Sequence, residues 1–403
     1  MKQQKGSGKK EEGETMEVGL LHELFPAMVE LRRHLHRHPE LSFREEETSA
    51  HIAERLQELG IEVSVNVGGY GVVGKIYGGL PGKTVALRAD MDALPIQDEK
   101  TCDYASEQPG VMHACGHDGH TATLLAVGEY FAKTREQLRG EIRLLFQPAE
   151  EVCPGGATSM IAAGALDGVD VIYGVHLWTP LPVGTVASRP GALMASTDEF
   201  FIEMQGQGGH GGMPHKTVDS VVAASALVLQ LQSVVSRSVD PLDPAVVTIG
   251  AIQGGTAQNI IADRCKLSGT VRCFEEGTRA LIRQRIHALT EGTAQAYGAE
   301  AIINYMPGYP SLINHEREYE RFMEAAPEVF GLHAELSTPI MPAEDFAYYV
   351  QKVPGCFMLV GAGNGQNAVY PHHHPKFDID EQAMLHAAGL LIAMAESYSA
   401  EHA

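Results

Sequence analysis

The sequence predicts an α/β protein whose mixed central sheet, flanked by helices, is interrupted by an inserted ferredoxin-like α+β domain. Three observations support this fold class. Apolar runs typical of buried strands alternate with helical patterns up to about residue 188 and again from residue 311. Residues 189–310 between them follow the order strand, helix, strand, strand, helix, strand. Candidate metal ligands occur in both outer segments, so we expect residues 16–188 and 311–403 to form one catalytic domain.

The chain opens with a charged tail at 1–15, which cannot bury enough surface to become ordered. Apolar residues at helical spacing from Met16 predict an amphipathic first helix. A second helix over 45–59 ends at Gly60, a residue typical of a helix C-terminus. Alternating and apolar runs then predict three strands, at 61–67, 72–77 and 84–87.

The catalytic segment continues with a helix over 121–134 and a buried strand over 141–146, which leads to the acid pair Glu150 and Glu151. After a helix over 159–165, the apolar run 169–175 ends at His176. Twice, therefore, a predicted strand ends at a candidate metal ligand, as expected where functional loops follow the carboxyl ends of strands. Taken alone, His176 would be a core or turn histidine.

The insert and the last segment complete the predicted element order. Four strands and two helices in the insert form a small separate layer, a lid on the catalytic domain. The strands are predicted at 200–205, 245–253, 264–274 and 300–305, and the helices at 218–236 and 278–297. The final segment returns to the first domain with a helix, a strand and a helix, at 316–330, 356–360 and 381–398. This split predicts that the late histidines 372–374 fold back against Cys115.

Composition limits the classes of function. The 403 residues are 44% hydrophobic and can bury a sizeable core. A formal charge of −21 disfavours nucleic acid and anionic membranes as partners. Six cysteines without paired spacing indicate reduced thiols, and no stretch approaches the roughly 18 uncharged apolar residues of a membrane span. We therefore expect a cytoplasmic protein that acts on a small molecule.

The segment 113–120 (HACGHDGH) carries the strongest chemical signal. Cys115 and His117 stand two residues apart and can both coordinate a transition metal. The adjacent Glu150 and Glu151 allow one carboxylate to bind the metal and the other to transfer protons. Sulfur, nitrogen and oxygen donors together suit zinc and its neighbours better than calcium or magnesium. The residues predict a metallohydrolase.

Two further histidine segments have alternative interpretations. One residue of 372–374 is expected to ligate metal, because Pro375 and Phe377 anchor the loop; the alternative is a solvated surface tract. His210 lies among four glycines, which offer little for core packing and allow close backbone approach, so we expect it to face substrate.

Six ordered segments carry a resemblance to a known family. They are 112–118 (MHACGHD), 146–151 (FQPAEE), 174–178 (GVHLW), 208–210 (GGH), 343–346 (AEDF) and 373–375 (HHP). The chain resembles the aminoacylase, hippurate hydrolase and auxin-conjugate amidohydrolase family of dinuclear metallopeptidases, and within it the bacterial L-aminoacylases. The resemblance implies a zinc-peptidase-like catalytic domain and cleavage of N-acyl-L-amino acids to a carboxylate and a free amino acid.

The resemblance also implies roles for individual residues. Glu150 becomes the general base for a hydroxide formed at two metals, which lower the pKa of water from 15.7 to about 7. Asp90 and Asp92 would orient the histidines from behind or cap a helix. The ligands of two divalent ions, Zn²⁺ with Co²⁺, Mn²⁺ or Ni²⁺ as alternatives, would be Cys115, His117, Glu151, His176 and His373, with His372 and His374 as alternatives to the last.

For the insert, the resemblance implies that His210 stabilises the oxyanion, commonly across a dimer, so a homodimer or homotetramer through the lid is expected. Asn259 and Arg272 match substrate-binding positions; Arg272 suits an α-carboxylate, with a surface salt bridge as its alternative. Cys153 departs from the family pattern and either packs as a small apolar group or ligates metal.

Four other functions compete with the aminoacylase assignment. Hippurate hydrolase and N-acetyl-diaminopimelate deacetylase belong to the same family. A thiol amidase would use Cys115 as nucleophile with His117, although residues two apart seldom face each other well enough. An inactive metal-binding homologue would not need the unligated base Glu150.

Overall fold

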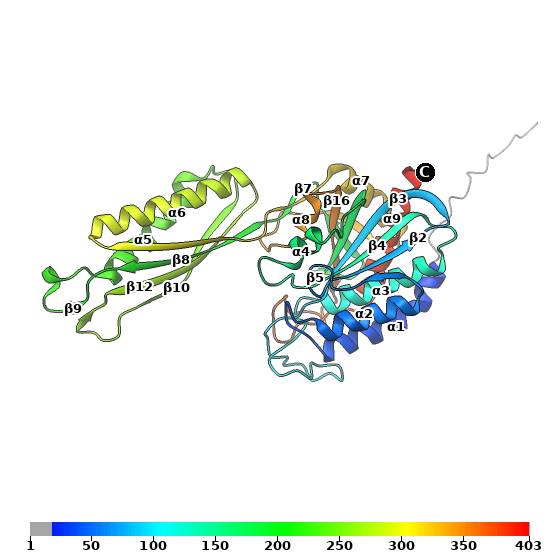
Figure 1. Ribbon diagram of the computed structural model, residues 1–403, viewed down its shortest axis with the longest axis horizontal. Helices are drawn as coiled ribbons and strands as arrows, with labels where there is room; N and C mark the ends of the chain where they lie inside the picture. The colour runs from blue at the N-terminus through cyan, green and yellow to red at the C-terminus, as the bar shows by residue number, and fades with distance from the viewer. Residues whose placement is uncertain (1–17, 403) are drawn as a thin grey trace, which may run out of the picture.

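The computed structural model describes residues 18–402 and has two parts (Figure 1). The larger part is an eight-stranded sheet with helices on both faces, and the smaller is a four-stranded sheet with two helices, which extends away from it as an arm. The mixed sheet and the separate antiparallel sheet confirm the predicted fold class. The predicted disordered tail, 1–15, lies outside the described residues.

The central sheet has the strand order β1-β2-β4-β3-β5-β16-β6-β15. The pairs β3·β4, β3·β5, β5·β16 and β6·β15 are parallel, while β1·β2, β2·β4 and β6·β16 are antiparallel. The strands are β1 (Glu62–Ser64), β2 (Val72–Tyr77), β3 (Leu80–Asp90), β4 (Arg139–Gln147), β5 (Val171–Pro182), β6 (Thr185–Ser188), β15 (His333–Leu336) and β16 (Gly355–Gly363).

Two apolar cores lie on opposite faces of this sheet, because successive strand residues point to opposite sides. On β3, Val85 and Leu87 join one core and Ala86 the other. The larger core packs against α1 (Val18–Arg37), α2 (Glu46–Glu58), α3 (His117–Lys133), α7 (Glu316–Ala325) and α9 (Gln382–Glu401); the smaller packs against α4 (Gly156–Ala162) and α8 (Ala347–Val350).

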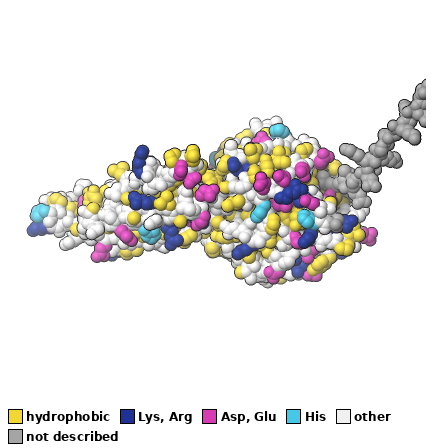
Figure 2. Space-filling view, turned by 90° about the horizontal axis from the view of Figure 1, so that it is seen from above, with side chains coloured by type: hydrophobic (Ala, Val, Ile, Leu, Met, Phe, Trp, Pro, Cys, Tyr) yellow, Lys and Arg dark blue, Asp and Glu magenta, His cyan; other side chains and the backbone are white. Residues whose placement is uncertain are grey.

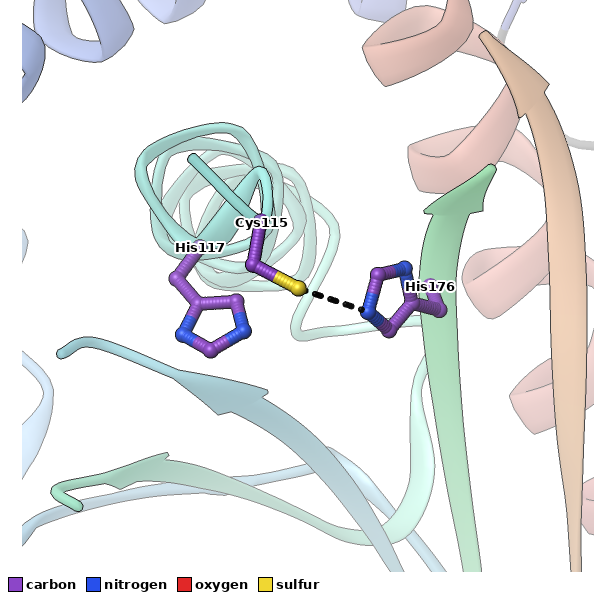
Figure 3. A group of neighbouring side chains, drawn as sticks. All are labelled: Cys115, His117 and His176. Atoms are coloured by element: carbon purple, nitrogen blue, oxygen red, sulfur yellow. Dashed lines mark hydrogen bonds between the residues drawn. The ribbon is translucent and has the colours of Figure 1, made fainter. Parts of the chain in front are cut away.

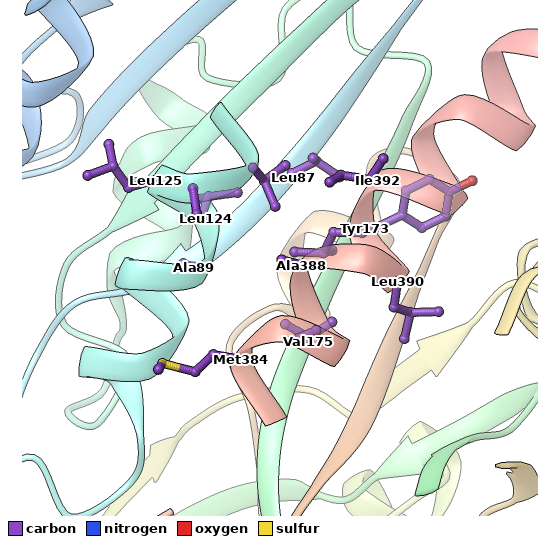
Figure 4. Close-up of a cluster of buried hydrophobic side chains, with 14 of the residues drawn as sticks. Leu87, Ala89, Leu124, Leu125, Tyr173, Val175, Met384, Ala388, Leu390 and Ile392 are labelled. Carbon is purple, nitrogen blue, oxygen red and sulfur yellow. The ribbon is translucent and has the colours of Figure 1, made fainter. Parts of the chain in front are cut away.

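Figure 4 shows the larger core, in which side chains of β3 and β5 meet α3 and α9. Leu87, Tyr173 and Leu124 are fully buried there. Each buried side chain of this size contributes roughly 1.5–3 kcal/mol through apolar burial. Contacts between α3 and α9 hold the last helix of the chain against the first half, as the split-domain prediction requires.

The arm, which we call the lid, has the strand order β10-β12-β8-β13, with every neighbouring pair antiparallel. This is the ferredoxin-like order. The strands are β8 (Ser196–Gln205), β10 (Ala245–Gly254), β12 (Arg264–Cys273) and β13 (Glu300–Pro307). The helices α5 (Ser220–Ser233) and α6 (Glu276–Tyr297) cover one face, and the short strands β9 (Gly209–His210) and β11 (Ile260–Ile261) form a ribbon at the far tip (Figure 1).

Two chain segments, which we call the crossings, join the lid to the larger part. One leads into β8 and the other follows β13. Near them, β7 (Gly191–Met194) pairs antiparallel with β14 (Leu312–Asn314). The predicted boundaries, 188/189 and 310/311, fall beside these strands.

Several predictions differ from the structure; for example, the helix predicted at 316–330 ends at Ala325, and the strand predicted at 61–67 spans Glu62–Ser64. Strand β5 continues through His176 to Pro182 because its register with β16 extends beyond the histidine, so His176 lies inside a strand. Helix α3 begins at His117, inside the ligand segment. Residues Ser220–Ser238 are long and apolar enough to cross a membrane by length and composition, with mean hydropathy 1.3, so the expectation that no stretch approaches a span was wrong. The buried side of this segment packs in the lid core.

Candidate metal centre

The five predicted ligands come together at one edge of the central sheet. Cys115 precedes α3, His117 begins it, Glu151 follows β4, His176 lies on β5 and His373 lies in the loop before α9. One ligand atom from each of Cys115, His117 and His176 lies within 4.8 Å of the others, as does one from each of Cys115, Glu151 and His373. Figure 3 shows the first group, with the sulfur between the two rings. The thiol thus belongs to both groups.

The geometry around His117 leaves one ring nitrogen available. Its Nδ1–H donates to the Asp92 carbonyl oxygen at 2.9 Å, with the Asp92 carboxylate at 3.3 Å. The buried Nε2 has no hydrogen-bond partner among residues 18–402. Burial lowers the pKa of His117, but Asp90 and Asp92 outweigh it and raise the pKa to about 10. A negative field therefore acts on a nitrogen that is free to bind a cation.

His176 presents a lone pair to the sulfur of Cys115. Its Nδ1–H donates to the Leu177 carbonyl oxygen at 3.0 Å, which leaves Nε2 as the acceptor, 3.5 Å from Sγ. Burial and the neighbouring His120 hold the pKa of His176 well below its ordinary value. Burial, Glu151 and Glu150 raise the pKa of the Cys115 thiol. A thiol kept protonated is a poor nucleophile, which disfavours the thiol amidase.

The two adjacent glutamates share His117 as a neighbour, since one carboxylate oxygen of each and one ring nitrogen of His117 lie within 4.8 Å of one another, and each has further neighbours of its own. Glu151 Oε1 lies 3.3 Å from His373 Nε2 and 3.9 Å from His117 Nε2. Glu150 is 7% exposed and has one carboxylate oxygen within 4.8 Å of oxygens of Glu344 and Asp345. Burial and Glu344 raise the pKa of Glu150 well above its ordinary value. The carboxyl of Glu150 therefore holds a proton more readily than a solvent-exposed glutamate does.

The backbone of this acid pair is held by Asp92. Its two carboxylate oxygens accept from the amides of Glu150 and Glu151, each at 3.0 Å. The preceding residue, Ala149, has φ +54°, a strained value for a residue with a side chain, and its amide donates to Glu45 at 2.7 Å. These buried acceptors fix the turn that carries two consecutive carboxylates.

Among the three late histidines, the structure places His373 at the centre. His373 has φ +64°, and its amide donates to the Ala114 carbonyl oxygen at 2.8 Å, which docks the loop beside Cys115. The His372 ring stacks on Trp178 at 4.5 Å and donates from Nε2 to the Leu177 carbonyl oxygen. The His374 ring stacks on Tyr370 at 4.4 Å. The alternatives His372 and His374 therefore have other contacts.

His120 shows how the same segment supplies a histidine that is not a ligand. Its Nδ1–H donates to Asp90 at 2.6 Å, and its Nε2 accepts from the Leu177 amide at 2.9 Å. Both ring nitrogens are occupied. Asp90 thus orients a histidine from behind the centre, as one of its two predicted roles requires.

The donor set fits a transition metal. It combines one thiolate-forming sulfur, three imidazole nitrogens and a carboxylate, and two of its buried atoms, His117 Nε2 and Glu151 Oε1, lack hydrogen-bond partners within the described chain. Sulfur and nitrogen donors in this number suit zinc, cobalt or nickel.

The predicted substrate residues lie apart from this centre. His210 and Asn259 sit together at the tip ribbon of the lid, at the end remote from the central sheet (Figure 1). Arg272 lies on β12 near the crossings, where it donates to Thr270 and to the Val271 carbonyl oxygen. One chain therefore brings the ligands together without His210 and Asn259.

Sequence reasoning missed a buried ionic cluster behind Glu150. The Arg88 guanidinium, 1% exposed, contacts Asp90 at 2.7 Å, Glu344 at 3.0 Å and Asp345 at 2.8 Å. The signal was present, since Arg88 stands two residues before Asp90 and the pair 344–345 belongs to a segment that resembles the family. Arg88 offsets part of the negative charge of these acids, although Glu344 still raises the pKa of Glu150.

Comparisons with known proteins agree with this geometry. Residues 86–397 match Peptidase family M20/M25/M40. The chain is 49% identical to Bacillus subtilis YhaA over 93% of this chain and 95% of that protein, and 47% identical to the N-acyl-L-amino acid amidohydrolase of Geobacillus stearothermophilus over 74% and 80%. The solved structure of Bacillus subtilis YxeP, described as a dinuclear metal binding peptidase of the M20 family, superposes with a TM-score of 0.80 at 36% identity, covering 94% and 99%. The chain belongs to peptidase family M20/M25/M40 and is a metal-dependent hydrolase.

Proposed function

We propose that this protein is an amidohydrolase that cleaves N-acyl-L-amino acids with two divalent metal ions. One observation carries the proposal: Glu150 lies beside the ligand groups, buried, while its neighbour Glu151 faces His117 and His373. A purely structural metal site needs no adjacent free carboxyl. The similarity to the Geobacillus stearothermophilus N-acyl-L-amino acid amidohydrolase supports the substrate class.

Cys115, His117, Glu151, His176 and His373 would hold the two ions, most simply Zn²⁺. When bound, such ions polarise a carbonyl group and lower the pKa of water. Glu150 accepts a proton from the attacking water and later returns it to the departing amine. Burial and Glu344 raise the pKa of Glu150, which favours retention of the proton once the carboxylate has accepted it.

The hydrogen bonding of His210 favours the tautomer that an oxyanion donor needs. The Gly212 amide donates to His210 Nδ1 at 3.0 Å, so in the neutral ring Nε2 carries the hydrogen. The side chain is exposed at the tip and free to donate to a substrate carbonyl. Because the tip lies far from its own metal centre, we propose that His210 and Asn259 act on the centre of a second copy.

The lid offers a surface on which a second copy could dock. Strand β10 is an edge strand with one unpaired side, and beside it α5 exposes Val222 and Leu229, the latter 75% exposed. Figure 2 shows the lid as a narrow arm with apolar side chains between charged ones. Two identical edges can pair antiparallel around a twofold axis. A homodimer, or a homotetramer built from it, would cover this surface.

A substrate panel tests the proposal. Metal-loaded enzyme is offered acetyl, benzoyl and succinyl amino acids, including N-acetyl-L-methionine, hippurate and N-acetyl-diaminopimelate, and amino acid release is measured alongside metal content. We expect release from several N-acetyl-L-amino acids. If the enzyme hydrolyses only hippurate, it is a hippurate hydrolase, and if it hydrolyses only N-acetyl-diaminopimelate, it is the corresponding deacetylase. If no substrate of the panel releases an amino acid, the protein is an inactive homologue.

A further inference from the structure

We infer that Tyr309 is a positioning residue that ties the orientation of the lid to the placement of Glu150. Tyr309 follows β13, at the crossing where the chain leaves the lid, and its side chain is 5% exposed. Its hydroxyl donates to the Glu150 carbonyl oxygen at 2.6 Å. The inference rests on the proposed role of Glu150 as the base.

This hydrogen bond completes the support of the Glu150 backbone. The amide of Glu150 donates to Asp92, two residues beyond the end of β3, while its carbonyl oxygen accepts from Tyr309. Asp92 therefore holds the peptide groups on both sides of the residue, because it also accepts from the Glu151 amide, and Tyr309 adds a second hydrogen bond to the peptide group that follows Glu150. The direction of the Glu150 side chain follows from this backbone support, to which the crossing contributes the Tyr309 hydroxyl.

The crossing itself is rigidly paired with the chain that enters the lid. The Thr197 amide donates to the Tyr309 carbonyl oxygen, and the Gly308 amide donates to the Thr197 carbonyl oxygen, both at 2.9 Å. A Cβ atom at Gly308 would lie 2.5 Å from the Thr197 carbonyl oxygen, so only glycine fits this approach. Tyr309 cannot shift without moving the entering chain.

A buried carboxylate clamps the same crossing to the body of the lid. Asp198, 2% exposed, accepts from Arg279 on α6, from the Tyr305 hydroxyl at 2.6 Å and from the Gly308 amide at 3.0 Å. Arg279 also donates to the Gly308 carbonyl oxygen at 3.0 Å. A rotation of the lid therefore displaces Gly308 and Tyr309. Through the hydrogen bond of the tyrosine hydroxyl, it also displaces the backbone of Glu150.

Tyr309→Phe tests the hydrogen bond, with Tyr348→Phe as the matched control. Tyr348 is the neighbouring tyrosine, 6.1 Å away between ring centroids, and its hydroxyl contacts the Gly308 carbonyl oxygen only at 3.4 Å. Loss of one hydrogen bond predicts that Tyr309→Phe lowers kcat roughly 2- to 12-fold, leaves KM within about twofold and keeps the metal content. The control keeps wild-type kcat.

Amide hydrogen exchange measured by mass spectrometry provides a readout independent of turnover. Faster exchange is expected at 149–156 in Tyr309→Phe and not in Tyr348→Phe. Asp198→Asn, which loosens the clamp, should speed exchange at 307–309 and also at 149–156.

The outcomes separate the two proposals. If the wild-type enzyme releases no amino acid, the proposed function is refuted. The hydrogen-exchange rates at 149–156 then still test whether Tyr309 holds the Glu150 backbone. Unchanged exchange at 149–156 in Tyr309→Phe, unchanged kcat, or an equal loss in Tyr348→Phe overturns the positioning role. Exchange that rises only at 307–309 in Asp198→Asn overturns the coupling to the lid.

Discussion

Replacing Glu150 with glutamine removes the proposed proton carrier while preserving its shape. The backbone bonds of this residue, to Asp92 and from Tyr309, do not involve the side chain and should persist. The substitution also removes one acid from a buried group that includes Glu344 and Asp345. Glu150→Gln should therefore fold and retain its metal.

The expected loss of activity follows from the role of the carboxyl. General acid–base catalysis contributes about 10²–10⁴ in rate, which corresponds to roughly 3–5 kcal/mol of transition-state stabilisation. Both proton transfers, from water and to the amine, pass through this one buried group, so the larger part of that range is expected in kcat. KM should change little because Glu150 is not expected to hold the substrate.

The assay measures kcat on N-acetyl-L-methionine together with metal per subunit. Glu151→Gln is the matched control, because the adjacent residue faces His117 and His373 and should lose metal when changed. The reasoning is refuted if Glu150→Gln keeps activity within tenfold of wild type, or if it loses metal as Glu151→Gln does.

Three further predictions concern the lid, the turn and the buried ions. His210→Ala should lower kcat without loss of metal, and mixing it with Glu150→Gln should restore roughly a quarter of wild-type activity, since half of the dimers would hold one intact site of two; no recovery would exclude action across a dimer. Burial and Asp92 raise the pKa of Glu45 from 4.5 to about 7, so its contribution to the free energy of unfolding, roughly 3 kcal/mol, is fully present below pH 4.5 and is lost as the pH rises through 7. Thermal unfolding of Glu45→Gln should lack this pH dependence, and an unchanged profile would contradict the assignment. Arg88→Met leaves three buried acids without their cation and should cost about 3–5 kcal/mol in urea unfolding, whereas wild-type stability would show that the cluster is unimportant.

Local patterns predicted much of the fold. Strand β2 begins and ends where the predicted strand 72–77 does, and α6 ends at Tyr297, directly before Gly298, which has φ +70°. The lid order follows from six elements in sequence, because the ferredoxin-like topology leaves one compact arrangement. The ligand segments were predictable in part, since His117 begins α3 and Glu151 follows β4 at the same sheet edge.

Long-range contacts were not predictable from the sequence. Nothing local to Tyr309 indicates that its hydroxyl meets the carbonyl oxygen of a residue 159 positions earlier. The continuation of β5 beyond His176 depends on its pairing with β16, nearly two hundred residues later. The remoteness of His210 from the centre likewise depends on how the lid extends from the crossings, which no residue pattern in β9 reveals.

The central claim is that hydrolysis depends on two metal ions held by this centre. Its most direct test is to remove metal with EDTA, confirm the loss by elemental analysis, and titrate Zn²⁺ or Co²⁺ back while following N-acetyl-L-methionine hydrolysis. We predict that activity disappears on chelation and returns to a plateau at two ions per subunit. Hydrolysis that survives EDTA but is abolished by iodoacetamide would contradict the claim and assign the reaction to the thiol of Cys115.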